Sequence, residues 1–117
     1  MLSVLSEQYR FPLSLEFSRI KKEGKLTNGP SFGVLTRERK DQSFSRFGFV
    51  VSTRVDKRAV VRHRLKRLLA EVVRLNLAKI KPGIDSVFLV KKTMIGLEFK
   101  QVEGEVLQTL GQNGFLI

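Results

Sequence analysis

The side chains best equipped for chemistry in this sequence are cations gathered in one short stretch. Seven of the 22 Lys and Arg residues lie from Arg54 to Arg67, and Asp56 is the one acid among them. Guanidinium groups suit phosphate because their planar fork donates two parallel, charge-assisted hydrogen bonds. Like charges repel from residue 57 to 67, where no acid occurs. A polyanion would relieve that repulsion, so the stretch is predicted to bind one.

The same stretch has the periodicity of an amphipathic helix. Its apolar face contains Val61, Leu65, Leu68, Leu69 and Val72. Its polar face contains His63, Lys66, Arg67 and Arg74, with Arg62 and Arg64 at the borders. We expect Asp56 to be the N-cap and Pro82-Gly83 to end the helix near Ile80. Such a helix packs on a core with one side and presents cations with the other.

No catalytic constellation is found in the sequence. His63 is the single histidine and there is no cysteine, which disfavours a zinc site. Glycine-rich phosphate-binding loops are absent. A metal-dependent nuclease needs several convergent carboxylates, whereas the 11 acids here are scattered. The chain is therefore predicted to bind a partner, with no catalytic residue and no metal ligand of its own.

Composition indicates a folded and strongly basic chain. Its 117 residues fit a single domain, 1–117, and 42% of them are hydrophobic. The net charge of +11 favours nucleic acid as the partner. Lack of cysteine suits a reducing cytoplasm, the first residues lack a signal-peptide pattern, and no apolar run could span a membrane. We expect a cytoplasmic protein with no membrane partner.

The remaining patterns predict an α+β fold, a two-layer sandwich in which helices pack on one small mixed sheet. Helices are expected over about 14–23 and 97–111. Strand composition covers 31–37, 46–53 and 86–92, with a polar hairpin loop over 37–45. The strands flanking the basic helix are expected to be parallel, and a fourth strand could lie within 25–45. Gly48 suggests a bulge or a close approach of another group.

Aromatic residues offer a second binding chemistry, because unpaired bases stack on exposed rings. Phe17, Phe32, Phe47 and Phe49 are the candidates by position, and Phe47 and Phe49 share one face of their strand. The ordinary place for phenylalanine is the core. A sheet face only partly covered by the first helix would still leave one or two rings accessible.

Two adjoining motifs resemble the protein component of bacterial ribonuclease P. The run Arg46–Ser52 (RFGFVVS) matches that family's R-x-G-[apolar]-x-V-S strand. The run Ala59–Arg67 (AVVRHRLKR) matches its basic helix, A-V-x-R-N-R-x-K-R. Arg10, Phe17, Gly24 and Phe32 fall where the family has its N-terminal pattern and its next strand.

The resemblance implies a ribonucleoprotein endoribonuclease in which this chain is the protein subunit. It implies a sandwich with a left-handed β-α-β crossover at the basic helix, where general rules predict a right-handed one. The expected partners are ribonuclease P RNA, one protein per RNA, and precursor tRNA. The RNA subunit would hydrolyse the phosphodiester with magnesium, which it mainly binds itself. The protein would hold the RNA and the 5′ leader of the precursor during 5′ maturation of tRNA.

The predicted site residues follow from the motif and the charge cluster. The expected RNA-binding set is Arg54, Lys57, Arg58, Arg62, His63, Arg64, Lys66 and Arg67. The expected leader cleft contains Phe17, Phe32 and Phe49. Three positions depart from the family pattern: His63 replaces its Asn, Ala70 stands where a further basic residue is common, and Leu35 lies near a common aromatic position.

Two other functions share parts of this pattern. A general RNA-binding or ribosomal-type protein would use the basic helix and need no leader cleft. A DNA-binding helix-turn-helix is less compatible, because about 30 residues and predicted strands separate the basic helix from the one before it.

Overall fold

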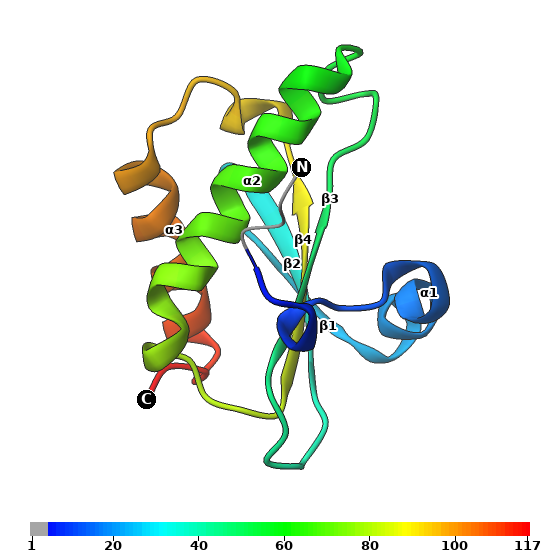
Figure 1. Ribbon diagram of the computed structural model, residues 1–117, viewed down its shortest axis with the longest axis vertical. Coiled ribbons are helices and arrows are strands. Elements are labelled where there is room, and N and C mark those ends of the chain that lie inside the picture. The colour runs from blue at the N-terminus through cyan, green and yellow to red at the C-terminus, as the bar shows by residue number, and fades with distance from the viewer. Residues whose placement is uncertain (1–4) are drawn as a thin grey trace.

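A four-stranded sheet forms the centre of the structure, a computed structural model that describes residues 5–117 (Figure 1). The strands are β1 (Lys25–Asn28), β2 (Phe32–Glu38), β3 (Arg46–Val50) and β4 (Ile84–Val90). Their order is β1-β2-β4-β3, with β3 and β4 parallel and the other neighbours antiparallel. The fourth strand expected within 25–45 is therefore β1, and the parallel pairing around the basic helix is confirmed.

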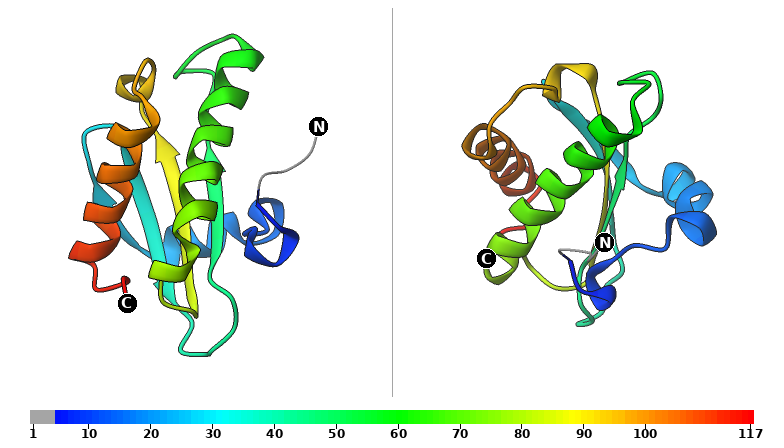
Figure 2. Two further views of the ribbon diagram at one scale, coloured as in Figure 1. Left: turned by 60° about the vertical axis from the view of Figure 1, so that its left-hand side comes forward. Right: turned by 45° about the horizontal axis from the view of Figure 1, so that its top comes forward.

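Helices cover the two faces of the sheet unequally. α2 (Ala59–Asn76) and α3 (Phe99–Gln112) lie on one face, and α1 (Leu13–Glu23) lies on the other (Figure 1 and Figure 2). Short 3-10 turns occur at η1 (Glu7–Tyr9), η2 (Leu77–Lys79) and η3 (Lys92–Met94). Within residues 5–117, no helix has the length and apolar character needed to cross a membrane. The predicted α+β architecture is confirmed.

The larger core lies between the sheet and the α2/α3 pair. Phe32 and Phe88 meet edge to face there, with ring centroids 5.3 Å apart. α2 contributes the predicted stripe, since Val61, Leu65 and Leu69 are buried, although Leu68 is only half-buried. Because α2 buries one side along its whole length, its opposite side remains at the surface.

The segment between β2 and β3 is not a hairpin loop, contrary to the sequence-based prediction. β4 lies between these two strands, so they are not neighbours. Arg39 holds the segment in place by donating to the Asp41 carboxylate at 3.1 Å and to the Phe44 carbonyl at 2.7 Å. The prediction failed because local composition indicates a polar connection without indicating which strands pair across it.

A row of charged side chains crosses the sheet beneath α1. Arg37, Asp85 and Arg46 are register partners on β2, β4 and β3, so they share a face. Asp85 is 0% exposed and accepts hydrogen bonds from Arg37 at 2.8 Å and from Arg46 Nε at 2.9 Å. Glu16 of α1 accepts from the same two arginines at 3.3 and 3.2 Å. The row therefore fastens α1 to the sheet.

The neighbouring row shows why residue 48 is a glycine. Leu35, Val87 and Gly48 are register partners, and Leu13 of α1 packs above Gly48. A Cβ at position 48 would lie 3.1 Å from Leu13 Cδ2, closer than the ordinary separation of two carbons. Gly48 thus allows α1 to approach the sheet closely, which is one of the two roles expected from the sequence.

Asp85→Asn tests the charged row. The substitution removes the negative charge shared by Arg37, Arg39 and Arg46 and replaces one of the two acceptor oxygens with a donor. We expect the free energy of unfolding near neutral pH to fall by about 3 kcal/mol, because buried arginines lose their counter-charge. Urea denaturation measures the loss. Asp41→Asn is the matched control, since Asp41 is an exposed partner of Arg39 and should contribute little. An equal loss in the two variants would contradict the assignment.

The same variant should show a characteristic pH dependence. Burial raises the pKa of Asp85, but hydrogen bonds from Arg46 and Arg37 outweigh burial and hold that pKa below the ordinary 3.8. The hydrogen bond from Arg46 also lowers the pKa of Glu16 below 4.5. Because both pKa values are lowered on folding, the stabilisation is present above the unfolded values and is lost as the pH falls through the folded ones. The stability difference between wild type and Asp85→Asn should shrink from about pH 5 toward pH 2, and a constant difference would refute the linkage.

Candidate nucleic-acid interface

The start of α2 differs from the sequence-based prediction. α2 begins at Ala59 with Arg58 at the N-cap position, and the Arg58 side chain makes no capping bond. Asp56, the predicted N-cap, accepts hydrogen bonds from the Arg58 backbone N–H at 2.8 Å and from its Nε at 3.0 Å. The hydrogen bond from the Arg58 side chain lowers the pKa of Asp56 to about 2. The prediction was wrong because Asp56 closes its own local turn ahead of the helix.

Arg62 is also engaged inside the protein. Its NH1 group donates to the carbonyl oxygens of Asp56 and Lys57 at 3.0 and 2.8 Å. Together with the Arg58–Asp56 pair, this contact holds the β3–α2 loop, residues 51–58, against the first turns of α2. Two members of the predicted RNA-binding set therefore shape the loop with their internal bonds.

The cations that α2 leaves available are Arg64, Lys66 and Arg67. All three are exposed, and no salt bridge among residues 5–117 engages them. The ion pair that α2 does make joins Arg74 to Glu71 in its last turns. The available positive charge is therefore concentrated in the N-terminal half of the helix.

Two open hollows flank a ridge formed by Val60 and His63. The first is about 630 Å³ and includes Arg64 and Arg67 in its lining, and the second is about 440 Å³ and includes Lys66. Val60 is 65% exposed, so an apolar side chain lies between the hollow with Arg64 and Arg67 and the hollow with Lys66. The arrangement suits an RNA backbone, whose successive phosphates could lie on either side of the ridge.

The eight predicted RNA-binding residues lie on the β3–α2 loop and on the N-terminal half of α2, and two of them, Arg58 and Arg62, bond within the protein. Arg54 and Lys57 are exposed on the β3–α2 loop, at the N-terminal end of α2. Position 70, which departs from the family pattern, faces inward, since Ala70 belongs to the larger core. Within residues 5–117, no group of three or more His, Cys, Asp or Glu side chains could hold a metal ion.

The predicted leader-cleft residues are not brought together. Phe17 packs with the cluster beneath α1, whereas Phe32 and Phe49 belong to the core on the α2/α3 face. Phe32 is 0% exposed, so a base from solvent cannot stack on its ring. Phe49 stacks on Phe88, with the two ring centroids 5.7 Å apart. The prediction of one cleft containing all three rings is therefore wrong, because strand alternation sends Phe32 and Phe49 to the opposite face from Phe17.

The face beneath α1 offers a different set, which we call the α1-face strip: Phe17, Leu26, Val50 and Leu89. Leu26 is exposed, and the other three are half-buried beside the small cluster of Phe11, Ile20, Leu35 and Val87. The Lys21 ammonium lies 5.2 Å from the Phe17 ring centroid and adds positive charge. Leu35, which departs from the family pattern, is buried under α1. The alternation of Leu89 with Phe88 in β4 was the signal that could have identified this strip.

Comparison with known proteins places these features in one family. The family model described as Ribonuclease P matches residues 5–113. The ribonuclease P protein component of Clostridium novyi is 32% identical over 111 residues, covering 94% of this chain and 97% of that protein. That of Synechocystis is 32% identical over 86% of this chain and 82% of its own length. A shorter match, 43% identical, covers 58% of this chain and 59% of the Alkaliphilus oremlandii component.

Solved structures agree with this comparison. The ribonuclease P protein of Thermotoga maritima superposes with a TM-score of 0.80 and 32% identity, over 88% of this chain and 96% of that one. The Staphylococcus aureus protein superposes with a TM-score of 0.81 over 93% and 98% of the two chains, at 23% identity, and supports the fold alone.

Arg64→Ala and Arg62→Ala should have different effects. Arg64 makes no ion pair with any residue from 5 to 117, so its removal should leave stability unchanged and reduce the salt slope of RNA binding by about one. Arg62→Ala removes two bonds to carbonyl oxygens and should lower the free energy of unfolding by about 1 kcal/mol. Urea denaturation and RNA titrations at several salt concentrations measure the two quantities. Equal stability losses, or an unchanged slope for Arg64→Ala, would contradict this division.

Proposed function

We propose that two surfaces of this chain bind two different RNAs. The premise is that the chain belongs to the ribonuclease P protein family and serves 5′ maturation of tRNA. The exposed side of α2 docks the catalytic RNA. The α1-face strip holds the single-stranded 5′ leader of precursor tRNA. The observation that carries the proposal is the set of exposed cations Arg64, Lys66 and Arg67 on a helix whose other side is core. No salt bridge within the described part of the chain engages these three side chains.

Docking through α2 is an electrostatic contribution. A precursor tRNA and a large RNA are both polyanions, so they repel each other when they assemble. Each protein cation that displaces condensed counterions from phosphate favours the complex. Arg64 and Arg67 lie in one hollow and Lys66 in the other, so phosphates on both sides of the Val60–His63 ridge gain a partner. The contribution of this chain is therefore to lower the cost of assembling the two RNAs.

Leader binding through the α1-face strip uses a different contact. An unpaired strand exposes base faces, which pack on aromatic and aliphatic side chains without regard to sequence. Phe17 supplies a ring and Lys21 a charge above it, while Val50 and Leu89 supply an apolar floor. A leader of variable sequence needs this kind of tolerant surface.

Magnesium is assigned to the RNA partner in this proposal. Among residues 5–117, no group of three or more His, Cys, Asp or Glu side chains could hold the ion, which supports this assignment. Hydrolysis would be carried out by the RNA subunit, with one protein bound per RNA. The chain would bind and orient the substrate without touching the reacting phosphodiester.

Reconstitution tests the docking role. The chain alone should cleave nothing, and with its cognate RNA it should lower the magnesium concentration needed for cleavage of precursor tRNA. The double variant Arg64→Ala/Arg67→Ala should lose most of this effect, because two phosphate contacts are removed. Lys92→Ala/Lys100→Ala removes the same charge outside α2 and is the matched control. If the two double variants behave alike, general charge rather than α2 carries the function.

Phe17→Ala tests leader binding. The RNA–protein complex carrying this variant should bind precursor tRNA about tenfold more weakly, while binding of mature tRNA is unchanged, because only the precursor has a leader to stack. Leu15→Ala is the control on the same helix, since Leu15 is 83% exposed and lies outside the strip. A general RNA-binding protein would instead show the same change for both tRNAs, and its crosslinks to RNA would not concentrate on the leader.

A further inference from the structure

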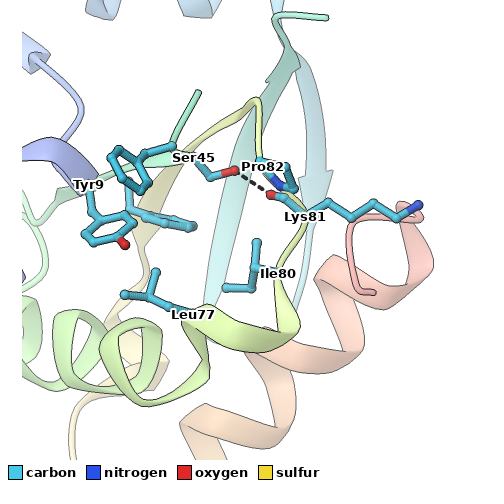
Figure 3. A pocket seen from close by; sticks show the side chains of 8 residues that line it. Tyr9, Ser45, Leu77, Ile80, Lys81 and Pro82 are labelled. Carbon is cyan, nitrogen blue, oxygen red and sulfur yellow. Dashed lines mark hydrogen bonds between the residues drawn. The ribbon is translucent and has the colours of Figure 1, made fainter. Parts of the chain in front are cut away.

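A small pocket lies at the β3 edge of the sheet, away from the α1-face strip. Three separate segments of the chain form it: η1, the start of β3, and the connection from α2 to β4 (Figure 3). The lining residues are Tyr9, Phe44, Ser45, Phe47, Leu77, Ile80, Lys81 and Pro82. Its volume is about 120 Å³, and it is open on one side. Neither the basic face of α2 nor the strip beneath α1 includes these residues.

The pocket is held open by bonds among its walls. Ser45 Oγ donates to the Lys81 carbonyl at 2.5 Å, drawn as a dashed line in Figure 3, and accepts from the Ile84 backbone N–H at 3.0 Å. Tyr9 and Phe44 meet edge to face with ring centroids 5.0 Å apart. The segment that follows η1 is held by the Phe11 backbone N–H, which donates to the Phe47 carbonyl at 2.9 Å. The shape therefore exists before a ligand arrives, which reduces the ordering cost of binding.

The size of the pocket limits what it can hold. An engineered protein cavity of roughly 150 Å³ binds benzene, so 120 Å³ suits one six-membered ring better than a fused purine. Drug-sized ligands need pockets of several hundred Å³ or more. Because the pocket is open on one side, a ring inside it can remain attached to a larger chain in solvent.

The lining indicates the chemistry of that ring. Tyr9, Phe44 and Leu77 offer apolar and aromatic surface, and Phe44 is 55% exposed at the opening. The Tyr9 hydroxyl makes no hydrogen bond among residues 5–117 and can pair with a polar ring edge. The Lys81 side chain extends outward from the pocket, where it can meet an anion (Figure 3). A flat ring with a polar edge and an attached anion is a pyrimidine nucleotide.

We propose that this pocket binds one unpaired pyrimidine base of an RNA strand, with Lys81 on a neighbouring phosphate. The inference rests on the proposed function, because it takes RNA as the partner. Leu77 follows Arg67 by ten residues, roughly 15 Å along α2, so an RNA docked on the helix reaches the pocket within a few nucleotides. The site would favour pyrimidine over purine at one position of that strand.

Binding of labelled pentanucleotides to the full chain tests the proposal. Phe44→Ala should weaken binding of oligouridylate about tenfold and leave oligoadenylate unchanged, because only the smaller base enters the pocket. Leu75→Ala is the matched control, since Leu75 is equally exposed at 55% and lies outside the pocket. Leu77→Ala enlarges the pocket and should improve oligoadenylate binding relative to oligouridylate. Circular dichroism checks that each variant is folded.

Crosslinking with 4-thiouridine in the pentanucleotide locates the base. Crosslinks at Tyr9 or Phe44 are expected, and crosslinks confined to α2 or the α1-face strip would overturn the proposal. Equal effects of Phe44→Ala on both oligonucleotides would also overturn it. Competition by a phenylalanine-containing peptide but not by oligouridylate would assign the pocket to a protein partner. Stimulation of precursor cleavage, measured in parallel, separates failure of this site from failure of the proposed function.

Discussion

The buried carboxylate of Asp85 is the interaction on which the arrangement of the sheet and α1 depends. A charge removed from water is tolerated only when its partners are well placed, and here arginines from β2 and β3 meet it on β4. Glu16 extends the same network to α1. Because this network fastens α1 over one end of the sheet face, the rows beyond it stay partly uncovered. The surface proposed for the leader is thus a result of where the ion network lies.

α2 solves a different electrostatic problem. Its cations repel one another, and packing of Val61, Leu65 and Leu69 against the sheet offsets that repulsion. Arg58 donates to the Asp56 carboxylate and Arg62 donates to backbone carbonyl oxygens of the loop. Fewer cations of this region are therefore available to a ligand. The charge count of the helix therefore overstates its binding capacity. The geometry of internal bonds decides which arginines are available.

Sequence reasoning succeeded where the signal was local and failed where it was not. The two faces of α2 follow from helical spacing, and the strand–helix–strand order predicts the parallel strand pair around it. Insertion of β4 between β2 and β3 could not be read from composition, since the pairing of strands is decided over long distances. Phe32 and Phe49 were placed in a cleft by analogy, although alternation along β2 and β3 turns them into the main core. The β3-edge pocket combines residues from three distant segments and has no local signal at all.

The glycine at position 48, which has no side chain, has a consequence for specificity. Leu13 rests so close to Gly48 that even a methyl group would displace it by a few tenths of an ångström. The distance between α1 and the sheet therefore depends on the absence of a side chain at Gly48. A larger side chain at position 48 would push α1 away from the sheet and change the packing of Phe17 against the cluster beneath it, without changing any charge. Binding of a single strand at the α1-face strip and electrostatic binding of a folded RNA at α2 could thus change independently in this chain.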